Sequence, residues 1–363
     1  MSDLASHLRQ LIERDGPISA ARYMAEALTH PKHGYYMRGD PFGAAGDFTT
    51  APEISQMFGE LVGLWCVQWW NQMGRPASVN LVELGPGRGT LMADALRAAR
   101  AVPAFRAAIE VHLVEISPAL RAHQRAALKG LRPRWHDRLA SVPDGPLILV
   151  ANEFFDSLPI CQFQRTQDGW RERLVGLEPE TGAFRFVLGS RGGAAARLIP
   201  PAVRGAPVGA IAEASPDGLA LAREIGERLT AAGGAALIID YGHARSAPGE
   251  TLQAVRRHAS HDVLAEPGTA DLTAHVDFES LARAAAEAGA RVYGPIPQGE
   301  FLEALGVGVR AEALIASATP AQAADLRAAC RRLTDPAEMG ALFKVLALAD
   351  PRRPAPAGFE ADP

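Results

Sequence analysis

The chain has 363 residues, a net charge of −4 and a hydrophobic fraction of 48%, which are ordinary values for a globular protein. This charge balance argues against the clustered basic surface of a nucleic-acid-binding protein. No apolar run approaches the roughly 18 residues needed to span a bilayer. The widely spaced Cys66, Cys161 and Cys330 form neither a disulfide framework nor a metal knuckle, so each is expected to be a small buried hydrophobe.

The N-terminal segment bears on location. It has no apolar signal core, and its acidic residues Asp3, Glu13 and Asp15 argue against a mitochondrial transit peptide. Together with the cysteine usage, this favours a cytoplasmic protein.

Residues 1–74 are predicted to form an N-terminal helical extension. Leu4, Leu8 and Ile12 recur at helical spacing, and Ser19 is a plausible N-cap for a second helix. The lid-like loop 31–55, rich in Gly, Pro and Asp, interrupts the helices.

Residues 75–350 alternate between strand and helix patterns, which is typical of a parallel sheet covered on both faces. The pattern predicts a seven-stranded, doubly wound α/β sheet. A β-rich insert of antiparallel hairpins is expected at about 160–212, and residues 351–363 form a proline-rich, flexible tail. The predicted strands are 79–84, 109–116, a short one near 132–136, 146–153, 235–242, 290–296 and 343–348.

The stretch "VELGPGRGT" places glycines between the first strand of this sheet and a helix that begins near Thr90. Gly85, Gly87 and Gly89 let the backbone approach a ligand closely at the carboxyl edge of the sheet. A glycine triplet alone is a weak signal, shared with dinucleotide enzymes. Glu83 is more specific, because a carboxylate at this position opposes a pyrophosphate and suits an ammonium group.

The second strand ends at Glu115, whose carboxylate can accept hydrogen bonds from both hydroxyls of a ribose. Nicotinamide enzymes share this acid but do not normally have the first one. The two acids together fit S-adenosyl-L-methionine, which carries an amino acid at one end and a ribose at the other. The alternative is a plain tight turn with two incidental glutamates.

The fourth strand ends in Asn152 and Glu153, with Asp156 shortly after. A carboxylate pair is what a guanidinium acceptor needs, since its pKa exceeds about 12 and carboxylates must orient it. The alternative is that these acids cap the following segment, Asp156 above all.

Polar residues also gather in the lid-like loop. Asp47, Thr49, Thr50, Glu53 and Ser55 stand between apolar residues, and we expect them to close over cofactor and substrate. A loop that only braces the first helices is the alternative.

Four further residues are candidates for contacts with the substrate or the cofactor. Asp240 and Tyr241 end the strand predicted beside the fourth, so they are expected near the substrate, with simple structural roles as the alternative. His275 is a candidate for orienting substrate, and His136 for contacting an adenine. The histidines show no metal-binding spacing, and no nucleophile elbow supports a hydrolase.

The motifs together resemble those of the MidA-like S-adenosylmethionine-dependent methyltransferases, relatives of the mitochondrial complex I assembly methyltransferase. They are "GYYMRGDPFGAAGDFTTAPEISQMFGE", "VELGPGRGT", "NEFFDSLP", "IIDYG", "ADLTAHVDF" and "FKVLA". The resemblance runs from about residue 5 to 348 in the same order. It implies a class I methyltransferase fold (Rossmann-like) with an N-terminal helical extension and an insert before the fifth strand.

By matching motif, the three glycines of the loop would bind the cofactor and Glu115 its ribose, while Asn152 and Glu153 would border the methyl-transfer site. The family's mitochondrial member is understood to dimethylate an arginine of a complex I subunit symmetrically. For this chain the resemblance implies a protein arginine methyltransferase.

Several functions stay open at this stage. The substrate can be a complex I subunit, another protein or a small molecule. The chain can also be a cofactor-binding assembly factor with little catalysis, or an NAD-dependent oxidoreductase. The sequence fixes neither the methylation state of the product nor the oligomer, for which a homodimer is one option.

Overall fold

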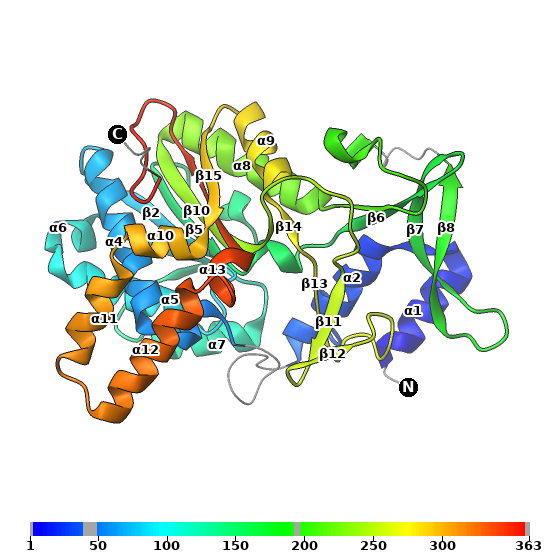
Figure 1. Cartoon of the computed structure of the whole chain (residues 1–363), viewed down its shortest axis with the longest axis horizontal. Coiled ribbons are helices and arrows are strands. Elements are labelled where there is room, and N and C mark those ends of the chain that lie inside the picture. Colours follow the sequence, from blue (N-terminus) through cyan, green and yellow to red (C-terminus); the bar gives the residue numbers. More distant parts are fainter. Residues whose placement is uncertain (1–2, 39–48, 192–196, 360–363) are drawn as a thin grey trace. The chain divides into compact units, whose positions relative to one another are not determined.

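The computed structural model describes residues 3–38, 49–191 and 197–359, and the chain divides into two compact units (Figure 1). Unit 1 comprises Met1–Phe48, Phe155–Ala220 and Arg245–Ser280. Unit 2 comprises Thr49–Phe154, Leu221–Ala244 and Leu281–Pro363.

Unit 2 contains the sheet that the sequence predicts, with seven strands in the order β15-β16-β10-β5-β2-β3-β4 along its main path. The five strands from β10 to β4 run parallel, and β16 runs antiparallel between β10 and β15. The expected α/β class is therefore confirmed. The bounds are β2 Val79–Leu84, β3 Ile109–Val114, β4 Arg134–His136, β5 Leu147–Asn152, β10 Gly234–His243, β15 Arg291–Pro297 and β16 Phe343–Ala349.

The central strands of this sheet are β2 and β5, and every residue of both is buried. Continuous runs of Val, Leu and Ile are typical of parallel strands covered on both faces. Leu84 of β2 pairs with Val114 of β3 and Ala151 of β5, so these strands end at one edge of the sheet. The chain order reverses between β2 and β5, which is where open α/β sheets bind ligands.

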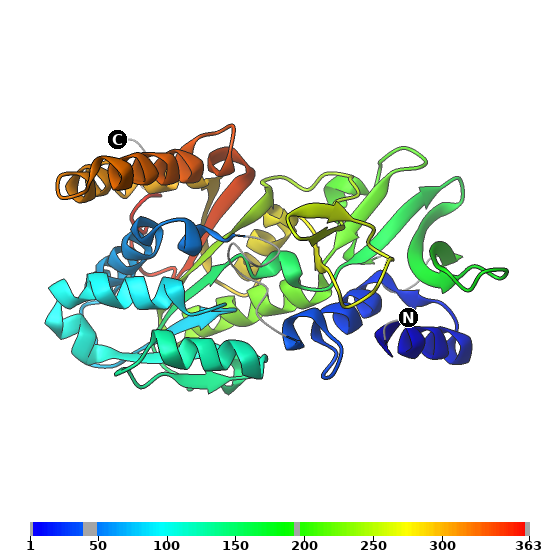
Figure 2. The same ribbon diagram turned by 90° about the horizontal axis from the view of Figure 1, so that it is seen from below.

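Helices cover this sheet. At one side of unit 2, α11 and α12 run alongside each other (Figures 1 and 2). Local caps fix where several of them begin: Ser117 caps α7, and a capping box of Thr319 and Gln322 begins α12. The bounds are α3 Ala51–Ile54, α4 Gln56–Gln72, α5 Thr90–Ala98, α6 Pro103–Ala108, α7 Pro118–Ala127, α8 Pro216–Ala232, α9 Phe278–Glu287, α10 Gln298–Ala304, α11 Val307–Ile315, α12 Pro320–Thr334 and α13 Met339–Leu342.

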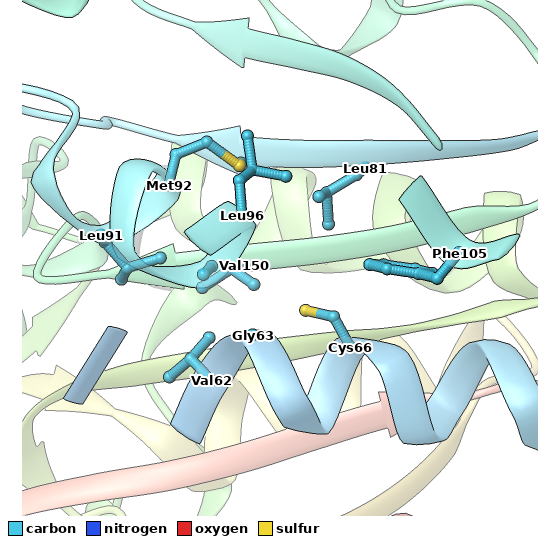
Figure 3. A pocket seen from close by; sticks show the side chains of 10 residues that line it. Val62, Gly63, Cys66, Leu81, Leu91, Met92, Leu96, Phe105 and Val150 are labelled. Carbon is cyan, nitrogen blue, oxygen red and sulfur yellow. The ribbon is translucent and has the colours of Figure 1, made fainter. Parts of the chain in front are cut away.

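Helices α4 and α5 of unit 2 pack closely against each other. A Cβ added at Gly63 would lie 2.5 Å from the Cα of Ala95 and 2.6 Å from its carbonyl oxygen. Beside this contact is a small apolar void of about 10 Å³, into which the Cys66 sulfur points (Figure 3). Burial raises the pKa of the Cys66 thiol to about 12, so this cysteine packs as a hydrophobe, as expected.

Unit 1 combines the first two helices with antiparallel sheets. Leu4, Leu8 and Ile12 are buried on α1, and the Ser19 hydroxyl accepts a hydrogen bond from the Arg22 amide at 3.0 Å, so both expected helices and the expected cap are confirmed. The bounds are α1 Asp3–Asp15, β1 Ile18–Ser19, α2 Ala20–Thr29, β6 Cys161–Thr166, β7 Gly169–Leu177, β8 Phe184–Arg191, β9 Ile211–Ala214, β11 Gln253–Arg256, β12 Ala259–His261, β13 Asp271–Thr273 and β14 Val276–Asp277.

The expected β-rich insert lies within unit 1. Strand β7 pairs antiparallel with β1, β6 and β8, and β6 also pairs with β9. A separate small sheet has the order β12-β11-β13. Within the described ranges, no helix has both the length and the apolarity needed to cross a membrane.

The contact at Gly63 gives a test of packing. We expect Gly63→Ala to lower the free energy of unfolding by about 1–3 kcal/mol, because the new methyl group overlaps the main chain of α5. Gly308→Ala in α11 is the matched control, since a Cβ there meets no atom within 4 Å. Calorimetric melting of both variants checks this, and equal melting temperatures would contradict it.

Candidate functional site

The glycine loop joins β2 to α5. Gly85, Gly87 and Gly89 have φ angles of 61°, 51° and 86°, in the left-handed region that side chains other than glycine rarely adopt. A Cβ at Gly85 would also lie 2.6 Å from the Phe154 ring. Conformation and space therefore both require glycine at this position.

Glu83 lies one residue before the end of β2 and is 3% exposed. Its Oε2 atom is buried and has no hydrogen-bond partner within the described part of the chain. Burial, and then the negative charge of Glu115, raise its pKa to about 8. An unpaired, buried carboxyl oxygen at a ligand-binding edge is what an incoming donor would satisfy.

Glu115 follows β3 and is also buried. Its Oε1 accepts a hydrogen bond from the Ser117 amide at 2.8 Å, and its Oε2 accepts one from Gln124 Nε2 at 3.2 Å. Burial raises the pKa of Glu115, while these donors act in the opposite direction. The structure thus brings both predicted acids to neighbouring strand ends.

The end of β5 carries Asn152 and Glu153. The Glu153 Oε1 atom accepts hydrogen bonds from the Ala51 amide at 2.8 Å and from Asn152 Nδ2 at 3.1 Å. The Oδ1 atom of Asn152 is buried and has no partner among the described residues. Glu153 itself has a φ of 50°, a strained angle for a side chain of this kind that costs on the order of 1–3 kcal/mol.

Asp240 of β10 is completely buried. Its two carboxylate oxygens accept hydrogen bonds from the Phe154 amide at 3.1 Å and from the Tyr241 amide at 2.9 Å. The side chain therefore holds the backbone that follows Glu153. The Tyr241 ring packs against Phe343, with ring centroids 5.5 Å apart.

The described part of the lid-like loop is fastened to the glycine loop. Glu53 accepts a hydrogen bond from the Thr90 hydroxyl at 2.5 Å and lies 3.7 Å from the Arg88 guanidinium. Thr50 is the N-cap residue of α3 and follows Thr49, and Ser55 caps α4 by accepting a hydrogen bond from the Met57 amide. Asp47 lies outside the described residues.

His136 ends β4, beside Glu115. Its main-chain oxygen accepts a hydrogen bond from the Glu115 amide at 2.9 Å, and its Nε2 lies 2.9 Å from Nδ1 of His112. Burial lowers the pKa of both imidazoles, that of His112 to about 4 with His136 adding to the effect, so both rings are neutral at pH 7.

Among the described residues, the predicted site residues Asp156 and His275 belong to unit 1. The Asp156 carbonyl accepts a hydrogen bond from the Ala274 amide, and the His275 amide donates one to the Thr251 hydroxyl. In the same unit the Tyr36 hydroxyl donates to Asp271 at 2.8 Å. The predicted carboxylate pair of Glu153 and Asp156 is thus divided between the two units, and the catalytic role of Asp156 stays a prediction.

Sequence reasoning missed Gln124, which bonds both Glu115 and the glycine loop, and the exposed Ile116, which follows Glu115. The sequence marks Gln124 only as a polar residue on the stripe of α7 that also carries Leu120, and its partners in the glycine loop and after β3 carry no such mark. The Ala51 amide gave no such signal, since every residue except proline has one.

His7, Glu26 and His30 of unit 1 place potential ligand atoms within 4.8 Å of one another, the grouping that comes nearest to a metal site in the described chain. However, Nδ1 of His30 accepts from the amides of Lys32 and His33, both at 3.2 Å. This tautomer leaves the proton on Nε2 and offers no lone pair there.

Comparison with known proteins agrees with this geometry. Residues 61–296 match the family described as S-adenosyl-L-methionine-dependent methyltransferase. The chain is 40% identical to "Protein arginine methyltransferase NDUFAF7, mitochondrial" of Danio rerio, over 96% of this chain and 87% of the relative. The human protein of the same name is 38% identical, over 96% and 83%.

A crystal structure from Burkholderia thailandensis, bound to S-adenosyl-homocysteine, is also similar. The alignment covers 99% of this chain and 92% of the other, with a TM-score of 0.80 and 32% identity.

The cytoplasmic location expected from the sequence is contradicted by these relatives, because those from Danio rerio, Drosophila melanogaster and Homo sapiens are all named as mitochondrial proteins. Unpaired cysteines indicate a reducing compartment, but they do not distinguish one reducing compartment from another.

The glycine loop, the two buried acids and the unpaired oxygens fit the methyl donor that the sequence indicates, and the matches cover nearly the whole chain. This chain belongs to the S-adenosyl-L-methionine-dependent methyltransferase family.

Proposed function

We propose that this methyltransferase transfers methyl groups to arginine side chains of a protein, with a respiratory complex I subunit as the candidate substrate. The names of relatives at about 40% identity support arginine as the acceptor. The observation that carries the proposal is Glu153, a carboxylate held at the end of β5 on a strained backbone. One of its oxygens accepts a hydrogen bond from the Ala51 amide at the start of α3, which holds the carboxylate in a fixed orientation.

The cofactor would lie along the ends of β2, β3 and β5. The glycine loop and Thr90 would surround its amino acid end, with Glu83 facing the ammonium group. Glu115 would accept the two ribose hydroxyls, and the edge formed by Ile116 and His136 would meet the adenine. When bound, S-adenosylmethionine supplies a methyl group already activated on a sulfonium.

The acceptor guanidinium would be held by Glu153. A carboxylate orients a guanidinium by paired hydrogen bonds and draws its charge away from the attacking nitrogen. As the new N–C bond formed, the S–C bond of the cofactor would break and its electron pair would stay on sulfur. The nitrogen would become more acidic as it accepts the methyl group, and Glu153 would take its proton. Asp240 would act indirectly, by holding the backbone on which Glu153 stands.

Glu153→Gln tests the acceptor role. The amide keeps the shape and the backbone demand of Glu153 but carries no charge to orient a guanidinium. We expect kcat to fall by about 100-fold or more, while the dissociation constant of S-adenosylhomocysteine changes less than about threefold. Methylation of arginine-containing protein is measured by mass spectrometry, and binding by calorimetry.

Glu338→Gln is the matched control, because Glu338 lies in the same unit and pairs only loosely with Arg331, at 3.8 Å. If Glu153→Gln kept wild-type methylation, the proposed acceptor site would be wrong. If a strain carrying Glu153→Gln kept the wild-type level of assembled complex I without methylarginine, an assembly-factor role would be favoured instead.

The substrate class has its own test. Methylarginine in the proteome of a strain lacking this gene is compared with that of its parent. We expect loss of methylation at one or a few arginines, and restoration by the wild-type gene but not by Glu153→Gln. Loss at lysines or in small molecules alone would contradict arginine as the acceptor.

Glu83 makes cofactor binding depend on pH. Its pKa of about 8 leaves it mostly protonated at pH 7, and a bound ammonium favours the ionised form. We therefore expect binding of S-adenosylhomocysteine at pH 7 to release close to one proton, with less released near pH 9. Calorimetry in buffers of different ionisation enthalpy measures this release.

The same pKa affects stability without ligand. Because the folded-state value lies above the unfolded value, this group stabilises the fold below about pH 4.5, and that stability is lost as the pH rises through about 8. Glu83→Gln should abolish both the proton release on binding and this contribution to the pH dependence of stability. Proton release that persists in the variant would assign the titration to another group.

A further inference from the structure

Gln124 is a completely buried polar side chain in α7. Leu120 and Leu128, four residues before and after it, are buried too, so the glutamine stands on the face of the helix that packs inward. A buried amide is costly unless it is hydrogen-bonded. Its bonds therefore indicate what the position does.

The amide of Gln124 connects three separate elements. Nε2 donates to the Gly87 carbonyl oxygen at 2.8 Å and to Glu115 Oε2 at 3.2 Å. Oε1 accepts from Nε1 of Trp135 on β4 at 2.8 Å. One side chain thus bonds the glycine loop, the acid after β3 and the neighbouring strand.

The direction of this amide follows from its partners. An indole N–H can only donate, so the oxygen of Gln124 must face Trp135. The NH₂ group then faces two acceptors, a carbonyl and a carboxylate. The reversed amide would set its oxygen against both acceptors and its NH₂ group against the indole N–H, so the orientation is determined by Trp135.

A second observation places α7 tightly against the loop. A Cβ at Gly89 would lie 3.3 Å from the Cα of Gln124 and 3.5 Å from its Cγ. The helix backbone and the amide therefore act on neighbouring positions of the same loop, Gly89 and Gly87.

We propose that Gln124 is a positioning residue of the cofactor site, which locks the glycine loop and the Glu115 carboxylate into one rigid receptor for S-adenosylmethionine. The inference rests on the proposed placement of the cofactor along these two elements. Gln124 acts through Gly87 and Glu115 and contacts no reacting atom.

The bond to Glu115 also has an electrostatic effect. Burial raises the pKa of Glu115, and the donors from Ser117 and Gln124 oppose this rise. The charged groups around it are Glu83 on β2 and Arg121 on α7, which also pairs with Asp137. Without the amide donor, Glu115 keeps its proton to a higher pH.

Two variants of the full chain test the proposal, with S-adenosylhomocysteine as the probe in calorimetric titrations from about pH 6 to about pH 9. Gln124→Met keeps the size of the side chain and removes both donor bonds, so we expect about tenfold weaker binding at neutral pH. As the pH is lowered, protonation of Glu115 should weaken binding, because ribose binding needs the ionised carboxylate. In Gln124→Met this loss of affinity should begin at a higher pH than in the wild-type chain.

Gln124→Glu should bind more weakly than Gln124→Met at neutral pH, because its carboxylate faces Glu115. The difference in affinity between the two variants should become smaller at low pH, where the protonated carboxyl group of Gln124→Glu can donate a hydrogen bond to Glu115. A role in packing alone predicts the opposite order, since Glu matches the shape of Gln.

Gln298→Met is the matched control. Gln298 is also completely buried in unit 2, and its Nε2 donates to the Leu333 carbonyl at 2.9 Å. We expect this variant to lower the melting temperature and to keep the wild-type dissociation constant and pH profile.

The outcomes separate the two levels of inference. Absence of binding by the wild-type chain would overturn the cofactor site itself. Wild-type affinity and pH profile in Gln124→Met would overturn only the positioning role. If Gln124→Met does not fold, Trp135→Phe frees the amide to rotate, and an unchanged dissociation constant in that variant would also overturn the proposal.

Discussion

The burial of Glu83 and Glu115 at neighbouring strand ends is the constraint on which the rest of the site depends. Removing two carboxylates from water is costly, and each makes ionisation of the other harder. Glu115 is compensated by amide donors, whereas Glu83 retains an unpaired oxygen and a pKa of about 8. In the proposed cofactor site, a bound ammonium group would offset the cost of ionising the buried Glu83, so part of the binding free energy would come from an electrostatic cost already present in the free protein.

Much of this arrangement is predictable from the sequence. Strands such as β2 and β5 are continuous apolar runs because both faces of a parallel strand are covered. The positions of Glu83 and Glu115 are predictable because the topology fixes where the strands end, and ligands bind at that edge of open α/β sheets.

Gln124 and α3 show why the rest is not predictable. In the sequence, Gln124 only interrupts the apolar stripe of α7. Its role becomes visible only when its hydrogen bond to Gly87, 37 residues earlier in the chain, is known. The Ala51 amide and Glu153 are separated by 102 residues, and one of the bonded groups is main chain. Unit 1 is assembled from three separate segments. Patterns within short windows carry none of these long-range contacts.

At Glu153 the backbone conformation and the proposed chemistry favour different residues. Glycine would adopt a φ of 50° without strain, and asparagine or aspartate with less strain than glutamate. Such a chain would keep the β5 edge and the cofactor loop but lose the oriented glutamate. Under the proposed acceptor role of Glu153, relatives that bind the cofactor without catalysis should carry glycine or asparagine at this position more often than relatives that methylate.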